Sequence, residues 1–196
     1  MQPRSSLRKV FGFYEQELNP WIEQALRKVT RVIDVGANDG YFTFGSAAAF
    51  RRLGKTGEIV AYEPDSRQVE KLRDSVAAQD GTGNCFQIVH SFVGAKVGEG
   101  VTTLDALTAA NRRDTLVKID VEGAEMEVLD GANSWLKTGN CFVIEVHQRA
   151  FLEQIQNLFQ KKGMRLKQVN QKPLALFGRE ERGEENWWLV TDLDQP

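Results

Sequence analysis

The sequence predicts an α/β domain in which a mostly parallel sheet carries helices on both faces. The first observation is that short β-branched segments alternate with helical segments of about ten to fifteen residues, the pattern of βαβ units. The second is that acids stand at or near the ends of four of the predicted strands: Asp34, Glu63, Asp120 and Glu145. In a parallel sheet these ends lie at one edge, where such folds bind their ligands. The sequence therefore predicts a site at this edge.

The individual elements follow from hydrophobic periodicity and from the residues that end each segment. A helix is expected over 14–29, ahead of the first strand. The following strands and helices are expected in order: strand 32–35, helix 41–53, strand 58–62, helix 66–79, strands 85–89 and 116–120, helix 123–136, strand 141–146, a helix through 162, and strands 165–169, 174–177 and 187–191. No linker divides the chain. One domain is expected over 1–196, with a helical segment over 1–29 and an α/β core over 30–196.

Composition excludes several classes of function. The chain has 196 residues, of which 41% are hydrophobic and 27% charged, as in a soluble globular protein. A formal net charge of −2 gives no reason to expect nucleic acid as a partner. Cys85 and Cys141 are far apart and are expected to be buried, reduced thiols. Neither a membrane span nor the apolar core of a signal peptide is recognised, so we expect a cytoplasmic protein without a membrane partner.

The turn after the first strand has the pattern of a ligand-binding loop. Residues 34–40 form D-x-G-x-N-x-G, in which Gly36 and Gly40 are the glycines. The dinucleotide pattern G-x-G-x-x-G fails, because Asn38 and Tyr41 occupy its second and third glycine positions. Asp34 precedes the first glycine, where a carboxylate suits a ligand with ammonium or sulfonium groups and opposes a phosphate. This favours S-adenosylmethionine (SAM), with its methionine part against the loop.

Two further positions suit an adenosine. Glu63 ends the second predicted strand, 29 residues after Asp34. An ionised carboxylate has two acceptor oxygens, so Glu63 can accept hydrogen bonds from both ribose hydroxyls. NAD enzymes use the same arrangement, so Glu63 indicates a ribose without choosing the cofactor. Ser91 follows the third strand, in the region where the adenine edge would lie.

Several motifs together resemble those of the FkbM-type SAM-dependent methyltransferases. They are VIDVGANDGYFT, YEPD, TTLDAL, VKIDVEGAEMEVLDGA and FVIEVH, spread over residues 30–150. The KIDVEGAE block is the most specific of them, because generic methyltransferases share the glycine loop but not that block. The resemblance implies a Rossmann-like class I methyltransferase fold, with a seven-stranded, mostly parallel sheet whose last strand is antiparallel. It also implies O-methylation of a saccharide or secondary metabolite, with S-adenosylhomocysteine as the second product.

The resemblance also assigns residues to the site. It gives a cofactor loop and a ribose acid, formed by Asp34, Gly36, Asn38, Gly40 and Glu63. It places Asp120, Glu122 and Glu125 at the edge where the methyl group would be presented. Glu122 and Glu125 also suit the positive start of the following helix, which is a structural reason for their presence. The match thins after His147, and little insertion remains for a dedicated substrate lid, so the acceptor stays open.

Methyl transfer from a sulfonium depends mainly on alignment, and a general base assists an alcohol acceptor. Asp120 is the first candidate for the base or for positioning the acceptor, because it ends the fourth strand of the core. His147 is the second. It follows Glu145 by two residues, so both side chains point to the same side of their strand, and Glu145 could orient the imidazole. These three side chains could also hold magnesium, but no spacing demands it and we expect no metal.

Two other functions stay open. A nucleotide-cofactor (NAD-type) oxidoreductase is disfavoured by the failed glycine pattern. A SAM-binding module without turnover is disfavoured by the presence of Asp120, Glu145 and His147. The expected partner is a small-molecule or saccharide acceptor, and the sequence leaves monomer and homodimer both open.

Overall fold

The structure is a computed structural model that describes residues 16–79, 83–109, 111–169 and 187–194. The main sheet contains β1 (Arg31–Val35), β2 (Glu58–Glu63), β3 (Cys85–His90), β6 (Thr115–Ile119), β7 (Cys141–Val146), β8 (Leu166–Val169) and β9 (Trp187–Thr191). A second, small sheet consists of β4 (Phe92–Val93) and β5 (Val101–Thr102). The helices are α2 (Asn19–Lys28), α3 (Tyr41–Arg52), α4 (Ser66–Ala77), α5 (Glu125–Asp130) and α6 (Arg149–Lys161), with short 3-10 turns η1 (Gln16–Leu18) and η2 (Leu104–Ala106).

The seven strands of the main sheet follow the order β3-β2-β1-β6-β7-β9-β8. Neighbouring strands pair in parallel from β3 to β7, whereas β9 is antiparallel to both β7 and β8. This confirms the predicted seven-stranded sheet with an antiparallel last strand. The chain moves outward from β1 to β3 and then returns to the other side of β1 at β6. The strand order therefore reverses between β1 and β6, which is where α/β sheets bind ligands.

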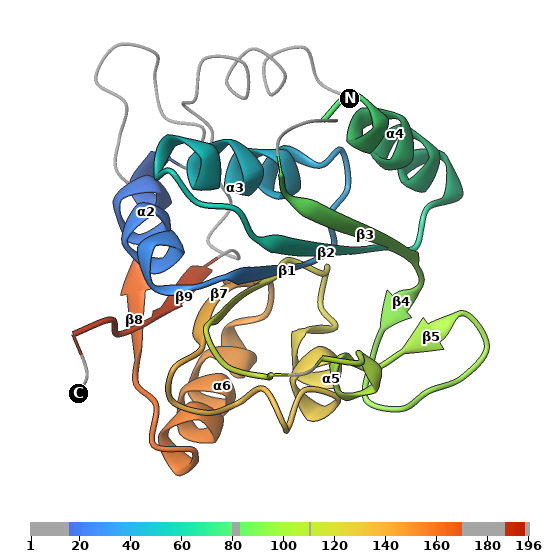
Figure 1. Cartoon of the computed structure of the whole chain (residues 1–196). Helices are drawn as coiled ribbons and strands as arrows, with labels where there is room; N and C mark the ends of the chain where they lie inside the picture. Colours follow the sequence, from blue (N-terminus) through green and yellow to red (C-terminus); the bar gives the residue numbers. More distant parts are fainter. Residues whose placement is uncertain (1–15, 80–82, 110, 170–186, 195–196) are drawn as a thin grey trace, which may run out of the picture.

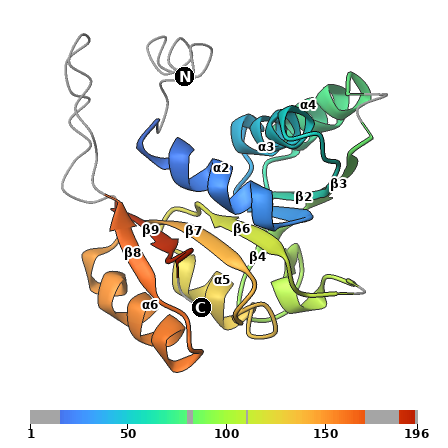
Figure 2. The ribbon, with the colours of Figure 1, turned by 60° about the vertical axis from the view of Figure 1, so that its left-hand side comes forward.

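Helices cover both faces of the sheet (Figures 1 and 2). Helices α2, α3 and α4 lie on one face, and α5 and α6 lie on the other. Adjacent residues of a strand point to opposite faces. Ile33 of β1 accordingly belongs to the apolar cluster of Phe159 in α6, and Val32 to the cluster of Leu26 and Phe50 in α2 and α3. Burial on both faces explains why the central strands are mostly apolar. The buried charged residues of β1, β6 and β7 are Asp34, Lys118 and Glu145.

Most predicted elements are present, and one helix is shorter than predicted. The helix expected over 123–136 is confined to α5 and ends at Asp130. A Cβ on Gly131 would lie 2.1 Å from the carbonyl oxygen of Gly94, so the chain packs closely against another loop here, and it then turns to bury Trp135. The β4–β5 sheet was not predicted, because strands of two residues are too short to show a period. The predicted strand over 174–177 lies outside the described residues.

The two cysteines differ in their surroundings. Cys141 is buried, and this burial raises the pKa of its thiol to about 11. Cys85 is exposed, so the expectation of two buried thiols is wrong for this residue. It begins β3, which is an edge strand of the sheet with a largely accessible surface. In the described part of the chain, no helix combines the length and the apolar character that crossing a membrane would require.

Candidate active site

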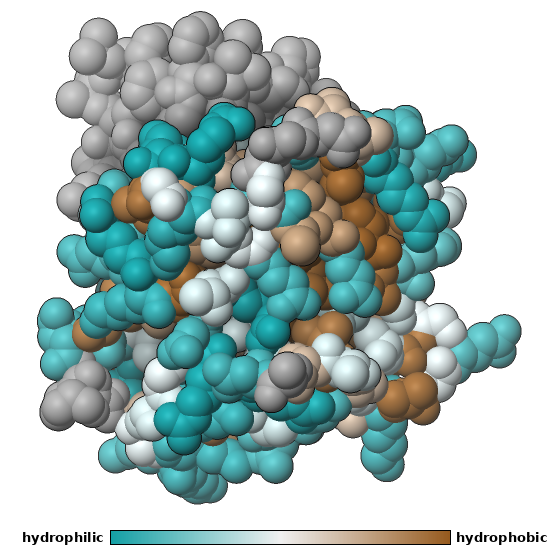
Figure 3. Space-filling model, viewed as in Figure 1, coloured by the Kyte–Doolittle hydropathy of each residue, from teal (hydrophilic) through white to brown (hydrophobic). Residues whose placement is uncertain are grey.

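A cavity of about 490 Å³ lies at the carboxyl edge of the sheet, where the strand order reverses. Its walls come from the turn after β1, the end of β2, the segment after β3 and the turn after β6, and they include Gly36, Asn38, Glu63, Ser91, Asp120 and Glu122. The volume lies within the range of small-molecule sites. Phe92, which is 60% exposed, lines the same cavity. Figure 3 shows a mostly hydrophilic face, with apolar areas gathered beside β3 and β5.

The turn between β1 and α3 is a tight loop fixed by backbone conformation. Gly36, Asn38 and Gly40 have positive φ values of 79°, 50° and 82°. A Cβ on Gly36 would lie 2.0 Å from the carbonyl oxygen of Asp120, so only glycine fits between the two turns. The backbone N–H of Gly36 donates to the carbonyl of Tyr62 at 3.0 Å, which fastens the loop to the end of β2. The loop backbone thereby forms part of the cavity wall.

Glu63 joins two turns at the cavity. One carboxylate oxygen accepts from the backbone N–H of Asn38 at 2.7 Å, and the other accepts from the N–H of Asp65 at 2.8 Å. The side chain is largely buried but still lines the cavity. A carboxylate oxygen can accept more than one hydrogen bond. Glu63 can therefore hold both turns and still accept from a ligand with two neighbouring hydroxyls.

Two of the predicted cofactor residues do not line this cavity, namely Asp34 and Gly40. Asp34 is completely buried below the loop, where one carboxylate oxygen accepts from the hydroxyl of Thr43 at 2.5 Å. Its other oxygen is 3.3 Å from the Lys118 ammonium group without hydrogen-bond geometry, so this contact is an ion pair only. Direct contact between Asp34 and a ligand stays a prediction. The hydroxyl of Ser91 donates to neighbouring backbone carbonyls, and its contact with adenine likewise stays a prediction.

Lys118 connects the loop to the acids at the strand ends. Its ammonium group donates to the carbonyl of Gly36 at 3.0 Å and pairs with Asp120 at 3.0 Å as well as with Asp34. Lys118 thus pairs with two acids at the ends of neighbouring strands. The register explains the choice of partner, because Asp34 and Lys118 are directly opposite each other on β1 and β6. The contact with the loop carbonyl was not visible in the sequence, since it joins residues 82 positions apart.

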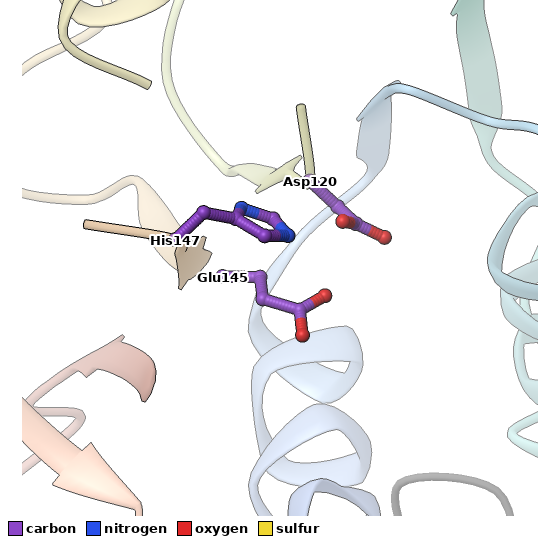
Figure 4. A group of neighbouring side chains, drawn as sticks. All are labelled: Asp120, Glu145 and His147. Carbon is purple, nitrogen blue, oxygen red and sulfur yellow. The ribbon is translucent and has the colours of Figure 1, made fainter. Parts of the chain in front are cut away.

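Asp120, Glu145 and His147 come together at the ends of β6 and β7. Each residue offers one nitrogen or oxygen atom that could bind a metal ion, and these three atoms lie within 4.8 Å of one another (Figure 4). Burial alone would raise the pKa of Asp120, but the charge of Lys118, hydrogen bonds with Glu145 and Lys118, and the charge of His147 together lower it. A hydrogen bond between two carboxyl groups requires a proton on one of them. The spacing also suits a metal ion, but Lys118 already contacts Asp120, and we assign no side chain here to a metal.

Behind His147 lies a residue whose partner the sequence did not reveal. Glu125, which is completely buried, places one carboxylate oxygen 2.6 Å from Nδ1 of His147. This hydrogen bond raises the pKa of His147 against the opposing effect of burial, and the charges of Glu145, Glu125 and Asp120 raise it further. The sequence placed Glu125 near the methyl group or at a helix start. Its actual partner depends on how α5 packs against the end of β7.

The sheet order, the glycine loop after β1, the acid at the end of β2 and the cavity between them together define a class I methyltransferase fold. Residues 87–169 match the family model described as "Methyltransferase FkbM domain". This match confirms the resemblance seen in the sequence. The matched range includes Asp120, Glu145 and His147, but it begins after the glycine loop and Glu63.

Solved structures show the same fold. The chain is similar to a methyltransferase FkbM from Methylobacillus flagellatus KT, with a TM-score of 0.67 and 17% identity over 84% of this chain and 44% of that chain. It is also similar to a precorrin-6y C5,15-methyltransferase from Geobacter metallireducens GS-15, with a TM-score of 0.60 and 18% identity over 90% and 88% of the chains. It is similar as well to the N-terminal domain of human METTL16, with a TM-score of 0.54 and 15% identity over 87% of this chain and 66% of that chain.

At these identities, the likeness to solved structures shows the fold and assigns no role to any residue. The chain spans less than half of the FkbM structure that it matches. No curated protein sequence matches the chain.

Proposed function

We propose that the chain binds SAM and transfers its methyl group to a hydroxyl of a saccharide or secondary metabolite, releasing S-adenosylhomocysteine. The observation that carries this proposal is the arrangement of the Gly36 loop, Glu63 and Asp120 around one cavity at the switch point of the sheet. The methyltransferase fold and the FkbM domain match support it. The choice of a hydroxyl acceptor rests on the resemblance and on the proton-accepting groups beside the cavity.

The charges around the cavity favour a cationic donor over a phosphate cofactor. The acids that line the cavity are Glu63, Asp65, Asp120 and Glu122. Asp34 lies below the loop, whereas Lys118 offsets only one of these negative charges. Two like charges about 4 Å apart near a protein surface repel by about 4 kcal/mol, which is roughly a thousandfold in affinity. A pyrophosphate against this loop would meet that repulsion. The sulfonium and ammonium groups of SAM would instead be attracted.

The proposed reaction is an in-line displacement. The acceptor oxygen forms a bond to the methyl carbon, the bond from that carbon to sulfur breaks, and sulfur keeps the electron pair. The hydroxyl proton goes to a side chain. Asp120 lines the cavity and can accept a hydrogen bond from the hydroxyl, but its lowered pKa makes it a weak base. His147, whose pKa is raised, is the stronger base and lies close to Asp120.

A thermal-shift experiment with SAM, S-adenosylhomocysteine, NAD and NADP tests the donor. A ligand at 100 times its dissociation constant adds about 2.7 kcal/mol of stability. For a domain of this size, that raises the melting temperature by about 5–11 °C. We expect this shift with the two SAM compounds only. A shift with NAD and none with either SAM compound would overturn the proposal.

Two variants localise the binding. Glu63→Gln loses the charge that would face the ribose, and we expect S-adenosylhomocysteine to bind about 10–100-fold more weakly in calorimetry, the value of a charged hydrogen bond. Glu58→Gln is the control, because Glu58 begins the same strand at the opposite edge and pairs with Arg31. We expect it to bind like the wild type. Equal loss in both variants would show that Glu63 does not contact the ligand.

Methyl-transfer assays on a panel of saccharides and metabolites test the acceptor, with the product identified by mass spectrometry. We expect a methyl ether as the product. The matching precorrin methyltransferase is named for positions C5 and C15, so the fold itself does not decide the acceptor atom. Asp120→Asn is then compared with the wild type. If binding and turnover both survive this change, Asp120 is neither the base nor the group that positions the acceptor.

A further inference from the structure

Glu125 and His147 form a hydrogen-bonded pair next to the proposed methyl-transfer site. Glu125 is the first residue of α5, and His147 directly follows β7. The Glu125 oxygen that lies 2.6 Å from Nδ1 of His147 also accepts from the backbone N–H of Gly123 at 3.2 Å and of His147 at 3.3 Å. An oxygen that receives two backbone N–H groups acts as an acceptor. Nδ1 must therefore donate, and in the neutral imidazole Nε2 then carries the lone pair.

The imidazole ring is turned toward the carboxyl groups of Asp120 and Glu145 (Figure 4). The side chain of His147 is 19% exposed, whereas that of Glu125 is completely buried. His147 does not itself line the cavity, but its ring lies close to Asp120, which does, while its Nδ1 edge is held from behind by Glu125. A base that is oriented in this way presents one defined atom to an incoming hydroxyl.

We propose that Glu125 is a positioning residue that holds His147 as the Nδ1–H tautomer, so that Nε2 takes the proton of the methyl acceptor. This inference deepens the proposed methyl transfer and rests on it for its catalytic meaning. The acceptor's O–H bond breaks as its proton moves to Nε2. The oxygen bonds to the methyl carbon, and the electron pair of the broken C–S bond stays on sulfur. The resulting imidazolium later releases its proton to water.

The groups around His147 are suited to this imidazolium. Glu125 faces it from α5, Glu145 from β7, and Asp120 from the end of β6, with Lys118 in contact with Asp120. The hydrogen bond to Glu125 is the largest contribution that raises the pKa of His147. A higher pKa makes Nε2 a stronger base, and it also means that the base is free only at higher pH. Activity should therefore increase with pH until His147 has lost its proton.

A purely structural role for Glu125 accounts less well for the contacts. The backbone N–H groups of Gly123 and His147 need only a neutral acceptor, which a glutamine would supply. The second carboxylate oxygen of Glu125 is buried and has no hydrogen-bond partner in the described part of the chain. An unpaired buried oxygen is costly. A negative charge on Glu125 would offset this cost by stabilising the positive charge that forms when the neighbouring imidazole accepts a proton.

Nitrogen-15 NMR tests the tautomer without any ligand. The chain contains two histidines, so His90 serves as an internal reference in every spectrum. In the wild type, we expect neutral His147 to show a protonated Nδ1 and an unprotonated Nε2. In Glu125→Ala, the Nε2–H form should become the major one. Glu125→Gln should keep the tautomer, because its amide oxygen still accepts, but should lower the pH at which His147 titrates.

The control is Glu127→Gln, an exposed acid in the first turn of the same helix, which should leave both histidines unchanged. An Nε2–H tautomer in the wild type would overturn the proposal, and this result needs no variant to fold. A His147 spectrum that is the same in the wild type and in both folded Glu125 variants would also overturn it. Because this measurement uses the free protein, its failure is distinct from a failure to bind SAM.

Kinetics provide the second test once an acceptor is known. His147→Ala should lower kcat by about 10²–10⁴-fold, the usual contribution of a general base. Glu125→Gln should lower it by a smaller factor, because the variant keeps His147 and changes only the group that orients its imidazole. The rising part of its pH–rate profile should move to lower pH, while the affinity for S-adenosylhomocysteine stays unchanged. A lower rate with an unmoved pH profile would contradict the positioning role.

Discussion

Replacing Gly36 by alanine would introduce a methyl group at the tightest point of the candidate site. Gly36 has a φ of +79°, and a Cβ built on it would lie 2.0 Å from the backbone carbonyl oxygen of Asp120. The obstructing atom belongs to the backbone, so no side-chain rotation relieves the contact. The loop and the turn after β6 would have to separate. Because Lys118 donates to the Gly36 carbonyl and pairs with Asp120, this separation would also disturb the ion pairs below the loop.

The size of the effect follows from two costs. A residue with a Cβ in the left-handed region costs about 1–2 kcal/mol. Inserting a methyl group into a close-packed site costs a further amount of about 1–3 kcal/mol. Together they predict a loss of about 2–5 kcal/mol in the free energy of unfolding, or about 4–20 °C in melting temperature for a domain of this size. This is a large part of the total stability of a typical domain.

Urea and thermal unfolding of Gly36→Ala and Gly45→Ala measure this effect against a matched control. Gly45 lies inside α3, and a Cβ on it would meet nothing within 4 Å. Alanine there should stabilise the protein by about 0.5–1 kcal/mol, because it reduces the freedom of the unfolded chain. Replacing glycine by alanine should thus lower the free energy of unfolding at position 36 and raise it at position 45. An unfolding midpoint of Gly36→Ala equal to that of the wild type would refute the reasoning.

Two other predictions concern buried charge and thiol reactivity. Lys118→Met leaves Asp34 and Asp120 without their cationic partner, and at neutral pH it should cost about 3–5 kcal/mol in urea unfolding. The pKa of Asp120 is lowered in the folded protein, so the stability linked to its ionisation is present above its unfolded pKa and is lost as the pH falls through the folded value. The deficit should therefore persist down to the unfolded pKa of 3.8 and shrink below it, and an equal deficit at pH 7 and at about pH 3 would contradict this account. In the native protein a thiol reagent at pH 8 should modify Cys85 alone, since Cys141 is buried with a pKa of about 11, and both should react in denaturant. Rapid modification of both thiols in the native protein would contradict the burial of Cys141.

The sequence alone predicted the alternating strands and helices of the core, because the patterns that specify them are local, whereas the seven-stranded sheet with its antiparallel last strand was implied by the family resemblance. A strand that is buried on both faces is mostly apolar, as in β1 and β7, where Asp34 and Glu145 are the buried exceptions, and the apolar side chains of a covering helix repeat about every 3.6 residues. The glycines of the loop after β1 reveal a turn for the same local reason, since left-handed backbone is cheap only for glycine. The position of Glu63 at the end of β2 followed from the strand boundary. These features depend on neighbours in the chain and on little else.

The partners of the buried charges were decided by the tertiary structure. The sequence predicted Asp34 as a ligand contact, and the packing of α3 on β1 gives its carboxylate a partner that periodicity does not reveal, the hydroxyl of Thr43. Glu125 and His147 are 22 residues apart, and they meet only because α5 is short and its first turn rests on the end of β7. The strand register places Lys118 between two acids, where periodicity could only indicate the face on which it lies. Periodicity assigns a side chain to a face, whereas its contacts depend on the exact distances between elements, which only the folded chain determines.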